Sequence, residues 1–169
     1  MESKQFERSK WEPPKEGWWK LNTDASFRIK TGDTTAGSIV RTHQGVVALA
    51  CGQRLQACKG PGEAELSAVL YGLSILSRYY RGPVCVESDC ASIITTLNNR
   101  ATNHSALFLL VTDIWHLGEL FKEVSFRATR RSSNKMAHEL AALARKQGDC
   151  LLGDVIVLLP CSLYKLWLG

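Results

Sequence analysis

Alternating hydrophobic and polar residues mark the first predicted strand, over residues 18–27. The odd-numbered residues lie on one face and the even-numbered residues, including Asp24, lie on the other. We therefore predict a half-buried strand with Asp24 on its open face. Residues 36–41 and 46–51 have strand patterns too, and the turn residues at 42–45 join them into a predicted hairpin. The chain should thus begin with three antiparallel strands.

The pattern changes to helical spacing after a Gly-Pro-Gly breaker. Hydrophobic residues then recur every three or four positions, and Glu65 lies on an adjacent face from which it could reach a neighbouring strand. A short β-branched run at residues 83–87 predicts the fourth strand. Ser88 or Asp89 can cap a helix that continues to about residue 97, because their side-chain oxygens accept the free amide hydrogens of a first turn. Asp89 should thus lie where a strand ends.

A helix, a strand and a second helix complete the predicted order. They are expected at residues 106–121, 124–129 and 135–147. The chain should therefore have three strands first, and then helices that alternate with two more strands. This order is typical of an α/β protein with one mixed sheet.

The two ends of the chain lack the periodicity of the middle. Residues 1–17 are polar and contain prolines, which indicates a flexible leader. Residues 149–169 form an apolar tail that Pro160 interrupts, and its apolar run is shorter than the ~20 residues of a membrane helix. We expect this tail to pack on a single domain spanning residues 18–148.

Composition and charge narrow the class of protein only slightly. A chain of 169 residues that is 45% hydrophobic can bury a sizeable core in one domain. The net charge of +5 suits a polyanionic partner, although many proteins with such a charge bind none. The six cysteines lack CxxC spacing and the chain begins without a secretory signal, so we expect free thiols and an intracellular location. Nucleus and cytoplasm are not separated, and no membrane partner is expected.

Three acids occupy different predicted elements and could converge on one divalent metal site. Asp24 lies in a strand, Glu65 early in a helix, and Asp89 at the end of a strand. Mg²⁺ prefers hard oxygen ligands and is commonly held by a few carboxylates together with water and substrate phosphate. Each acid also has a simpler interpretation. Asp24 could be solvated, Asp89 could only cap a helix, and Glu65 could be a first-turn acid favoured by the helix dipole.

Four local sequences then suggest a family. They are LNTDAS at 21–26, GEAELSAVLYGL at 62–73, VESDCASII at 86–94 and NKMAHELAALA at 134–144. In this order they resemble the successive motifs of the ribonuclease H type 1 family, and more narrowly those of its plant branch related to reverse-transcriptase elements. The resemblance covers roughly residues 18–147. Four ordered motifs are far more specific than any one of them.

The resemblance implies a fold, an activity and a set of ligands. It implies a five-stranded mixed sheet flanked by helices and cleavage of the RNA strand of an RNA/DNA hybrid by a monomer that uses Mg²⁺ or Mn²⁺ and no small-molecule cofactor. Asp24 matches the first-strand aspartate that bridges both metals, Glu65 the first-helix glutamate, and Asp89 the aspartate that ends the fourth strand. Two such ions can stabilise both the attacking and the departing oxygen of an in-line displacement.

The fourth motif departs from the pattern of the nucleases. His138 stands where they carry an aspartate, as in plant relatives. An imidazole ligates Mn²⁺ more readily than Mg²⁺, and the neighbouring Glu139 is turned away by about 100° along the helix. The loop before the last helix also lacks the histidine that many nucleases keep, so the proton-transfer residue is unassigned. Two functions remain open: a hybrid ribonuclease with His138 as its fourth ligand, or an impaired module that binds hybrid or structured RNA without turnover.

A further group of polar residues is predicted to contact nucleic acid. Arginines can clamp phosphates through bidentate hydrogen bonds, and phosphate contacts make affinity depend on salt. The predicted contacts are Lys20, Asn22, Ser26, Arg130, Arg131 and Asn134. A plain solvated surface is the alternative for the basic members of this group.

Overall fold

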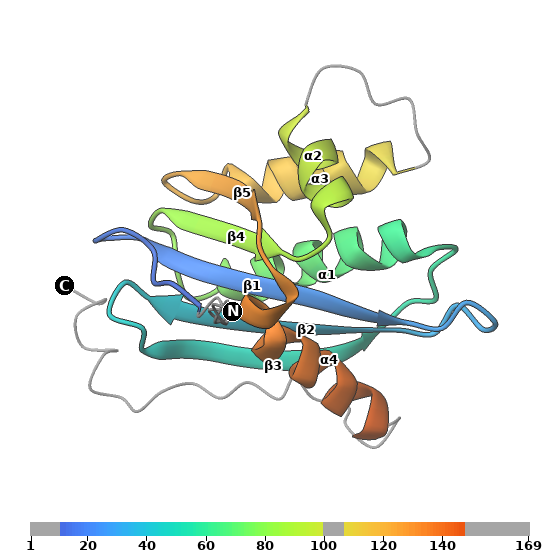
Figure 1. Ribbon diagram of the computed structural model, residues 1–169. Helices are drawn as coiled ribbons and strands as arrows, with labels where there is room; N and C mark the ends of the chain where they lie inside the picture. The colour runs from blue at the N-terminus through green and yellow to red at the C-terminus, as the bar shows by residue number, and fades with distance from the viewer. Residues whose placement is uncertain (1–10, 100–106, 148–169) are drawn as a thin grey trace, which may run out of the picture.

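The computed structural model describes residues 11–99 and 107–147, which form one five-stranded sheet with helices on both faces (Figure 1). The strands are β1 (Trp19–Phe27), β2 (Thr34–Thr42), β3 (Val47–Leu55), β4 (Val84–Ser88) and β5 (Val124–Ala128). The helices are α1 (Pro61–Leu76), α2 (Ala91–Asn98), α3 (Phe108–Gly118) and α4 (Lys135–Gln147), and the short 3-10 helix η1 (Arg131–Ser133) precedes α4. Every predicted element is present. The predicted tail at 149–169 lies outside the described residues.

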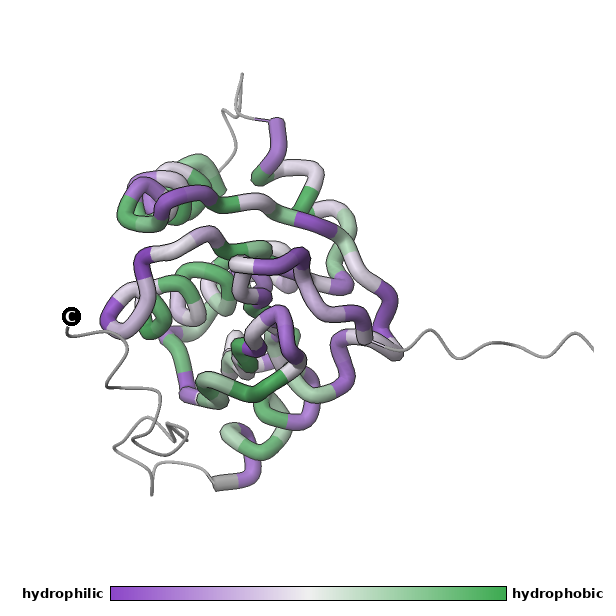
Figure 2. Tube along the Cα trace, turned by 90° about the vertical axis from the view of Figure 1, so that its left-hand side faces the viewer, coloured by the Kyte–Doolittle hydropathy of each residue, from purple (hydrophilic) through white to green (hydrophobic). Residues whose placement is uncertain are grey.

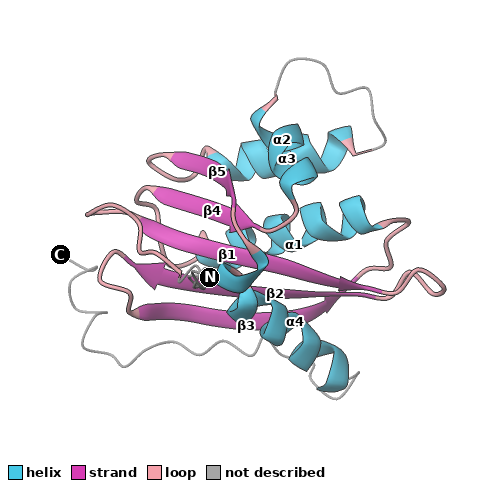
Figure 3. Cartoon of the chain, in the orientation of Figure 1, coloured by secondary structure: helices cyan, strands magenta, loops and turns pink. Residues whose placement is uncertain are grey.

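The strand order across the sheet is β3-β2-β1-β4-β5. Strands β1, β2 and β3 pair antiparallel, whereas β4 pairs parallel with both β1 and β5. Figure 3 shows the strands as one layer with helices in front of it and behind it. The prediction of a mixed sheet that begins with three antiparallel strands is confirmed.

Helix α1 covers one face of the sheet and builds the hydrophobic core. Leu21 of β1, Val40 of β2 and Leu73 of α1 are fully buried there. Gly72 lets the helix approach closely, because a Cβ at this position would lie 2.7 Å from Oγ of Ser38. Figure 2 shows hydrophobic and hydrophilic positions interspersed along the trace, as expected when each element has one buried face. Burying one such large apolar side chain stabilises the fold by about 1.5–3 kcal/mol.

Helix α4 covers part of the other face and lies directly on β2. A Cβ at Gly37 would overlap the carbonyl oxygen of Ala137 and the amide nitrogen of Ala141, so only glycine allows this approach. Oγ1 of Thr35 donates a hydrogen bond of 2.8 Å to the carbonyl oxygen of Ala141. Because Gly37 is the register partner of Asp24 in β1, this packing brings the first turn of α4 beside Asp24.

The prediction that Asp24 lies on an open face is wrong. Lys20, Asn22 and Asp24 are only 7%, 0% and 5% exposed, so β1 is buried on both faces over residues 20–24. Helix α4 covers one end of this face, and residues 11–17, which we call the N-terminal segment, lie over the other end (Figure 1). Period-2 alternation distinguishes the two faces of a strand but does not say what covers each of them.

The prediction that Ser88 or Asp89 caps the following helix is also wrong. Cys90 is the N-cap of α2, and no side chain caps that helix. Oγ of Ser88 instead accepts a hydrogen bond of 3.1 Å from the amide of Cys90. None of the helices in the described part of the chain is long and apolar enough to cross a membrane.

Candidate active site

The site lies where β1 and β4 stop pairing. Their parallel register runs from Trp19 opposite Val84 to Asn22 opposite Glu87, and it ends there. Strand β1 continues beyond this point with β2, while the chain leaves β4 after Ser88. Asp24 and Asp89 therefore follow the last pair on two strands that have just separated, and polar groups from other elements can enter between them.

Asn134 joins the two separated strands. Its Nδ2 donates to the carbonyl oxygen of Thr23 at 2.9 Å and to Oδ1 of Asp89 at 3.3 Å. Its Oδ1 accepts a hydrogen bond of 3.2 Å from Nδ2 of Asn22. Asn134 is 1% exposed, so its side chain forms its hydrogen bonds with these protein groups and not with water. Nε of Arg131 lies 3.8 Å from Oδ2 of Asp89, and the Arg131 side chain is otherwise exposed.

His138 of α4 contacts Asp24 directly. Nδ1 of His138 lies 2.8 Å from Oδ2 of Asp24, and with the carboxylate ionised Nδ1 carries the proton. Burial raises the pKa of Asp24, while the hydrogen bond from His138 opposes that rise and the charge of Asp89 adds to it. The Asp24 side chain is buried and that of His138 is 48% exposed, so one edge of the imidazole remains accessible to solvent.

Glu65 reaches the same region from α1, on the opposite face of the sheet. Burial, and to a lesser degree the charges of Asp24 and Asp89, raise the pKa of Glu65 to about 8, against the lowering effect of a hydrogen bond from the backbone of Ala25. Oε2 of Glu65 is buried without a hydrogen-bond partner among residues 11–99 and 107–147. The three predicted acids therefore interact electrostatically, and Glu65 is the least satisfied of them.

The donor chemistry of these acids fits a divalent cation, although their spacing is not that of a closed site. Carboxylate oxygens are the ligands that Mg²⁺ prefers. A bound cation would give the buried Oε2 of Glu65 the partner that it lacks among the described residues. Within the described residues, however, no three His, Cys, Asp or Glu side chains are close enough as they stand to hold one ion. Asp24, Glu65 and Asp89 are therefore candidate ligands by their donor chemistry and by their electrostatic interaction with one another.

Four of the six predicted nucleic-acid contacts are engaged in internal contacts. Nζ of Lys20 pairs with Oε1 of Glu87 at 2.6 Å and donates to the carbonyl oxygen of Glu12 at 2.8 Å. Asn22 is fully buried, and Oγ of Ser26 accepts a hydrogen bond of 2.7 Å from Nε of Arg145. These side chains are not placed to meet a phosphate directly. Asn134 is buried as well, as described above.

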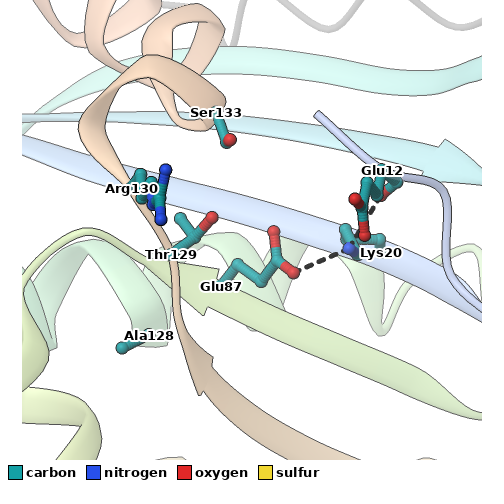
Figure 4. A pocket seen from close by; sticks show the side chains of 7 residues that line it. All are labelled: Glu12, Lys20, Glu87, Ala128, Thr129, Arg130 and Ser133. Carbon is teal, nitrogen blue, oxygen red and sulfur yellow. Dashed lines mark hydrogen bonds and ion pairs between the residues drawn. The ribbon is translucent and has the colours of Figure 1, made fainter. Parts of the chain in front are cut away.

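Arg130 and Arg131 are exposed and remain available to a partner. Both lie between β5 and α4, and Arg130 lines a pocket of about 560 Å³ (Figure 4). The pocket is lined by Glu12, Lys20, Glu87, Ala128, Thr129, Arg130 and Ser133. In Figure 4, Arg130 and Ser133 lie on one side of it and Glu12 with Lys20 on the other.

Sequence reasoning missed two residues that hold this region together. Glu87 accepts from Lys20 and from Nδ2 of Asn22, which lies 3.1 Å from its Oε2. A sequence signal for Glu87 does exist, because it is the charged residue in the otherwise apolar run at 83–87. In the structure it lies opposite Asn22. Trp11 donates from Nε1 to Oδ1 of Asn22 at 3.0 Å, and no periodicity in the leader indicates this contact.

Comparison with known proteins agrees with this fold and these motifs. The model of the reverse transcriptase-like family matches residues 22–144. An Arabidopsis thaliana protein named "Putative ribonuclease H protein At1g65750" is 31% identical over 136 residues, which are 79% of this chain and 22% of the relative. The chain thus matches about a fifth of that relative's length.

Solved structures of ribonucleases H have the same fold. Ribonuclease H1 of the halophilic archaeon Halobacterium salinarum superimposes with a TM-score of 0.72 at 17% identity, covering 78% of this chain and all of that one. A ribonuclease H1 isolated from compost, solved in complex with an RNA/DNA hybrid, gives a TM-score of 0.68 at 18% identity, covering 76% of this chain and 97% of that one. The chain therefore belongs to the reverse transcriptase-like family and has the ribonuclease H-like fold.

Proposed function

We propose that this chain is a divalent-metal-dependent endonuclease that cleaves the RNA strand of RNA/DNA hybrids. The observation that carries the proposal is the approach of Asp24, Glu65 and Asp89 from three elements to the point where β1 and β4 separate. The family match, the name of the Arabidopsis relative and the hybrid bound to one structural neighbour support it.

The three carboxylates would hold Mg²⁺ or Mn²⁺, and such an ion supplies stabilisation of the attacking and departing oxygens. The neighbouring side chains orient these carboxylates. Asn134 fixes Asp89 through Oδ1, and His138 fixes Asp24 through Oδ2. Since Nδ1 of His138 is engaged by Asp24, Nε2 is the nitrogen that remains for a ligand or for substrate.

The substrate backbone would approach along the segment between β5 and α4. Arg130 and Arg131 are exposed there, and Arg131 lies beside Asp89. Guanidinium groups bind phosphate oxygens in bidentate geometry but do not act as acids or bases at neutral pH. Their part is to bind and orient the hybrid, and the buried Lys20 and Asn22 take no direct part in that contact.

The experiment that tests the proposal is cleavage of a labelled RNA/DNA hybrid in Mg²⁺ and separately in Mn²⁺. We expect the wild type to cut, and Asp24→Asn to lose more than about 100-fold of the rate, because a neutral amide is a poor substitute for a carboxylate ligand. Asp33→Asn is the matched control, since Asp33 lies on the loop after β1 and pairs with Arg54. Equal rates for wild type and Asp24→Asn would overturn the proposal.

The alternative is a module that binds the hybrid without turnover. It is favoured by the contact of 2.8 Å that places a nitrogen of His138, and not a carboxylate, against Asp24. Hybrid that is bound but uncut in both metals would establish this alternative. His138→Asp then distinguishes a modified site from a lost one. We expect it to raise Mg²⁺-supported cleavage, and an unchanged or lower rate in a well-folded variant would remove His138 from the site.

A further inference from the structure

The N-terminal segment is fastened to the polar face of the sheet by Trp11. This residue precedes the part of the chain that the family model matches, which begins at residue 22. The guanidinium carbon of Arg41 lies 4.1 Å from the centre of its ring, and Nζ of Lys20 lies 5.5 Å from it. Nε1 of Trp11 donates to Oδ1 of Asn22 at 3.0 Å. Trp11 thus contacts a fully buried amide and not only a surface.

A continuous series of hydrogen bonds leads from Trp11 to Asp89. Nδ2 of Asn22 donates to Oε2 of Glu87 and to Oδ1 of Asn134, at 3.1 and 3.2 Å. Nδ2 of Asn134 in turn donates to the carbonyl oxygen of Thr23 and to Oδ1 of Asp89. Because both asparagines are 1% exposed or less, water cannot substitute freely for any of these partners.

The indole determines which way these amides point. An asparagine side chain has one acceptor oxygen and two N–H donors, whereas an indole N–H can only donate. With the N–H of Trp11 against it, the oxygen of Asn22 faces Trp11 and its nitrogen faces Glu87 and Asn134. A reversed Asn22 amide would place its oxygen against the oxygens of Glu87 and Asn134. The orientation of Asn134, and therefore its contact with Asp89, depends on this arrangement.

We propose that Trp11 is a positioning residue for the acidic site, acting on Asp89 through the amides of Asn22 and Asn134. This inference rests on the proposed function, since it assigns Trp11 to the same carboxylate site. It also makes the N-terminal segment a part of the functional unit, although this segment precedes the family match. Trp11 contacts Asn22, Lys20 and Arg41, none of which is a candidate ligand, and its effect passes through the two buried asparagines.

Trp11→Phe is the variant that isolates the hydrogen bond. Phenylalanine keeps an aromatic face for Arg41 and Lys20 but has no N–H for Asn22. Trp18→Phe is the matched control, because the ring of Trp18 contacts Nζ of Lys15 at 4.2 Å on the same part of the chain. Trp11→Ala removes ring and hydrogen bond together. Thermal unfolding of each variant separates a loss of stability from a change at the site.

Two readouts that do not depend on catalysis test the proposal in the full-length chain. The first is the NMR signal of the Asn134 side-chain amide, and the second is the dissociation constant for Mn²⁺ measured by calorimetry. In Trp11→Phe we expect the Asn134 signal to shift and the dissociation constant to rise about five-fold, the effect of one lost hydrogen bond. Trp18→Phe should change neither. An unchanged Asn134 signal, an unchanged Mn²⁺ affinity, or equal effects in Trp18→Phe would overturn the proposal.

Cleavage of the labelled hybrid is measured in parallel and decides the proposed function separately. A wild type that binds Mn²⁺ and leaves the hybrid uncut would contradict the nuclease, while the Asn134 signal and the Mn²⁺ affinity would still decide the role of Trp11. Conversely, a wild type that cuts the hybrid, with a Trp11→Phe variant identical to it in both readouts, would keep the nuclease and refute the positioning role.

Discussion

The two faces of β1 differ in what they bury. On the α1 face, Leu21 packs against Val40 and Leu73 in a continuous apolar core. On the α4 face, Lys20 and Asn22 are also buried, but they are polar. Both contact Glu87, and both form a hydrogen bond with the N-terminal segment. The apolar residues of the α1 face stabilise the fold by leaving water, and their burial needs no hydrogen-bond partner. The polar face is stable only while every group keeps its partner, and it is where the candidate chemistry lies.

Glu65 breaks this division, because it is an acid that extends from the helix of the apolar face. Folded Glu65 keeps its proton up to about pH 8, whereas the unfolded chain releases it near the ordinary value of 4.5. Between these values the folded state binds more protons, so the free energy of unfolding falls as the pH rises. The contribution is fully present below about pH 4.5 and is lost as the pH passes 8.

We therefore expect Glu65→Gln to be the more stable protein at high pH in metal-free buffer. The difference from wild type should be on the order of 4 kcal/mol at pH 9 and should shrink toward pH 4.5. Denaturant titrations across this range measure it, with Glu139→Gln on the exposed side of α4 as the control. Adding Mn²⁺ at pH 9 should restore stability to the wild type and not to Glu65→Gln. Parallel pH curves for the two proteins would contradict the raised pKa.

Each face of the sheet has one glycine that allows a helix to pack closely, Gly37 under α4 and Gly72 in α1. At Gly37 an added Cβ meets the backbone of α4, which cannot rotate away, whereas at Gly72 the nearest atom is the hydroxyl of Ser38, which can. We expect Gly37→Ala to destabilise the protein by about 3 kcal/mol and Gly72→Ala by about 1 kcal/mol, since overpacking against rigid atoms costs more and alanine favours a helix. Denaturant unfolding compares them, and equal losses would show that α4 shifts as readily as Ser38.

The sequence predicts the elements well because local periodicity reports them directly. The order of strands and helices follows from alternation and helical spacing, and Asp24, Glu65 and Asp89 are placed on the elements where the structure has them. The burial of Asp24 does not follow, because it depends on Gly37 allowing α4 to lie on β2 and on Trp11 covering the rest of the face. The capping role of Asp89 fails for a related reason. Its carboxylate interacts with Asn134 and Arg131, which lie far along the chain, and not with the next amides.

The smallest expected effect is on the salt dependence of hybrid binding, through the exposed Arg130 and Arg131 at the edge of the polar face. If Arg130 and Arg131 bind phosphates, each contact releases counterions, and the affinity for a hybrid falls linearly with salt on logarithmic axes. Replacing either arginine with alanine should reduce that slope by about one and weaken binding similarly for all sequences. Lys122→Ala, an exposed cation at the opposite end of β5, is the control and should leave the slope unchanged. Fluorescence anisotropy with Asp24→Asn protein measures binding without cleavage. If Lys122→Ala lowers the slope as much as Arg131→Ala does, the net charge of the protein determines hybrid binding, and not a specific contact by Arg130 and Arg131.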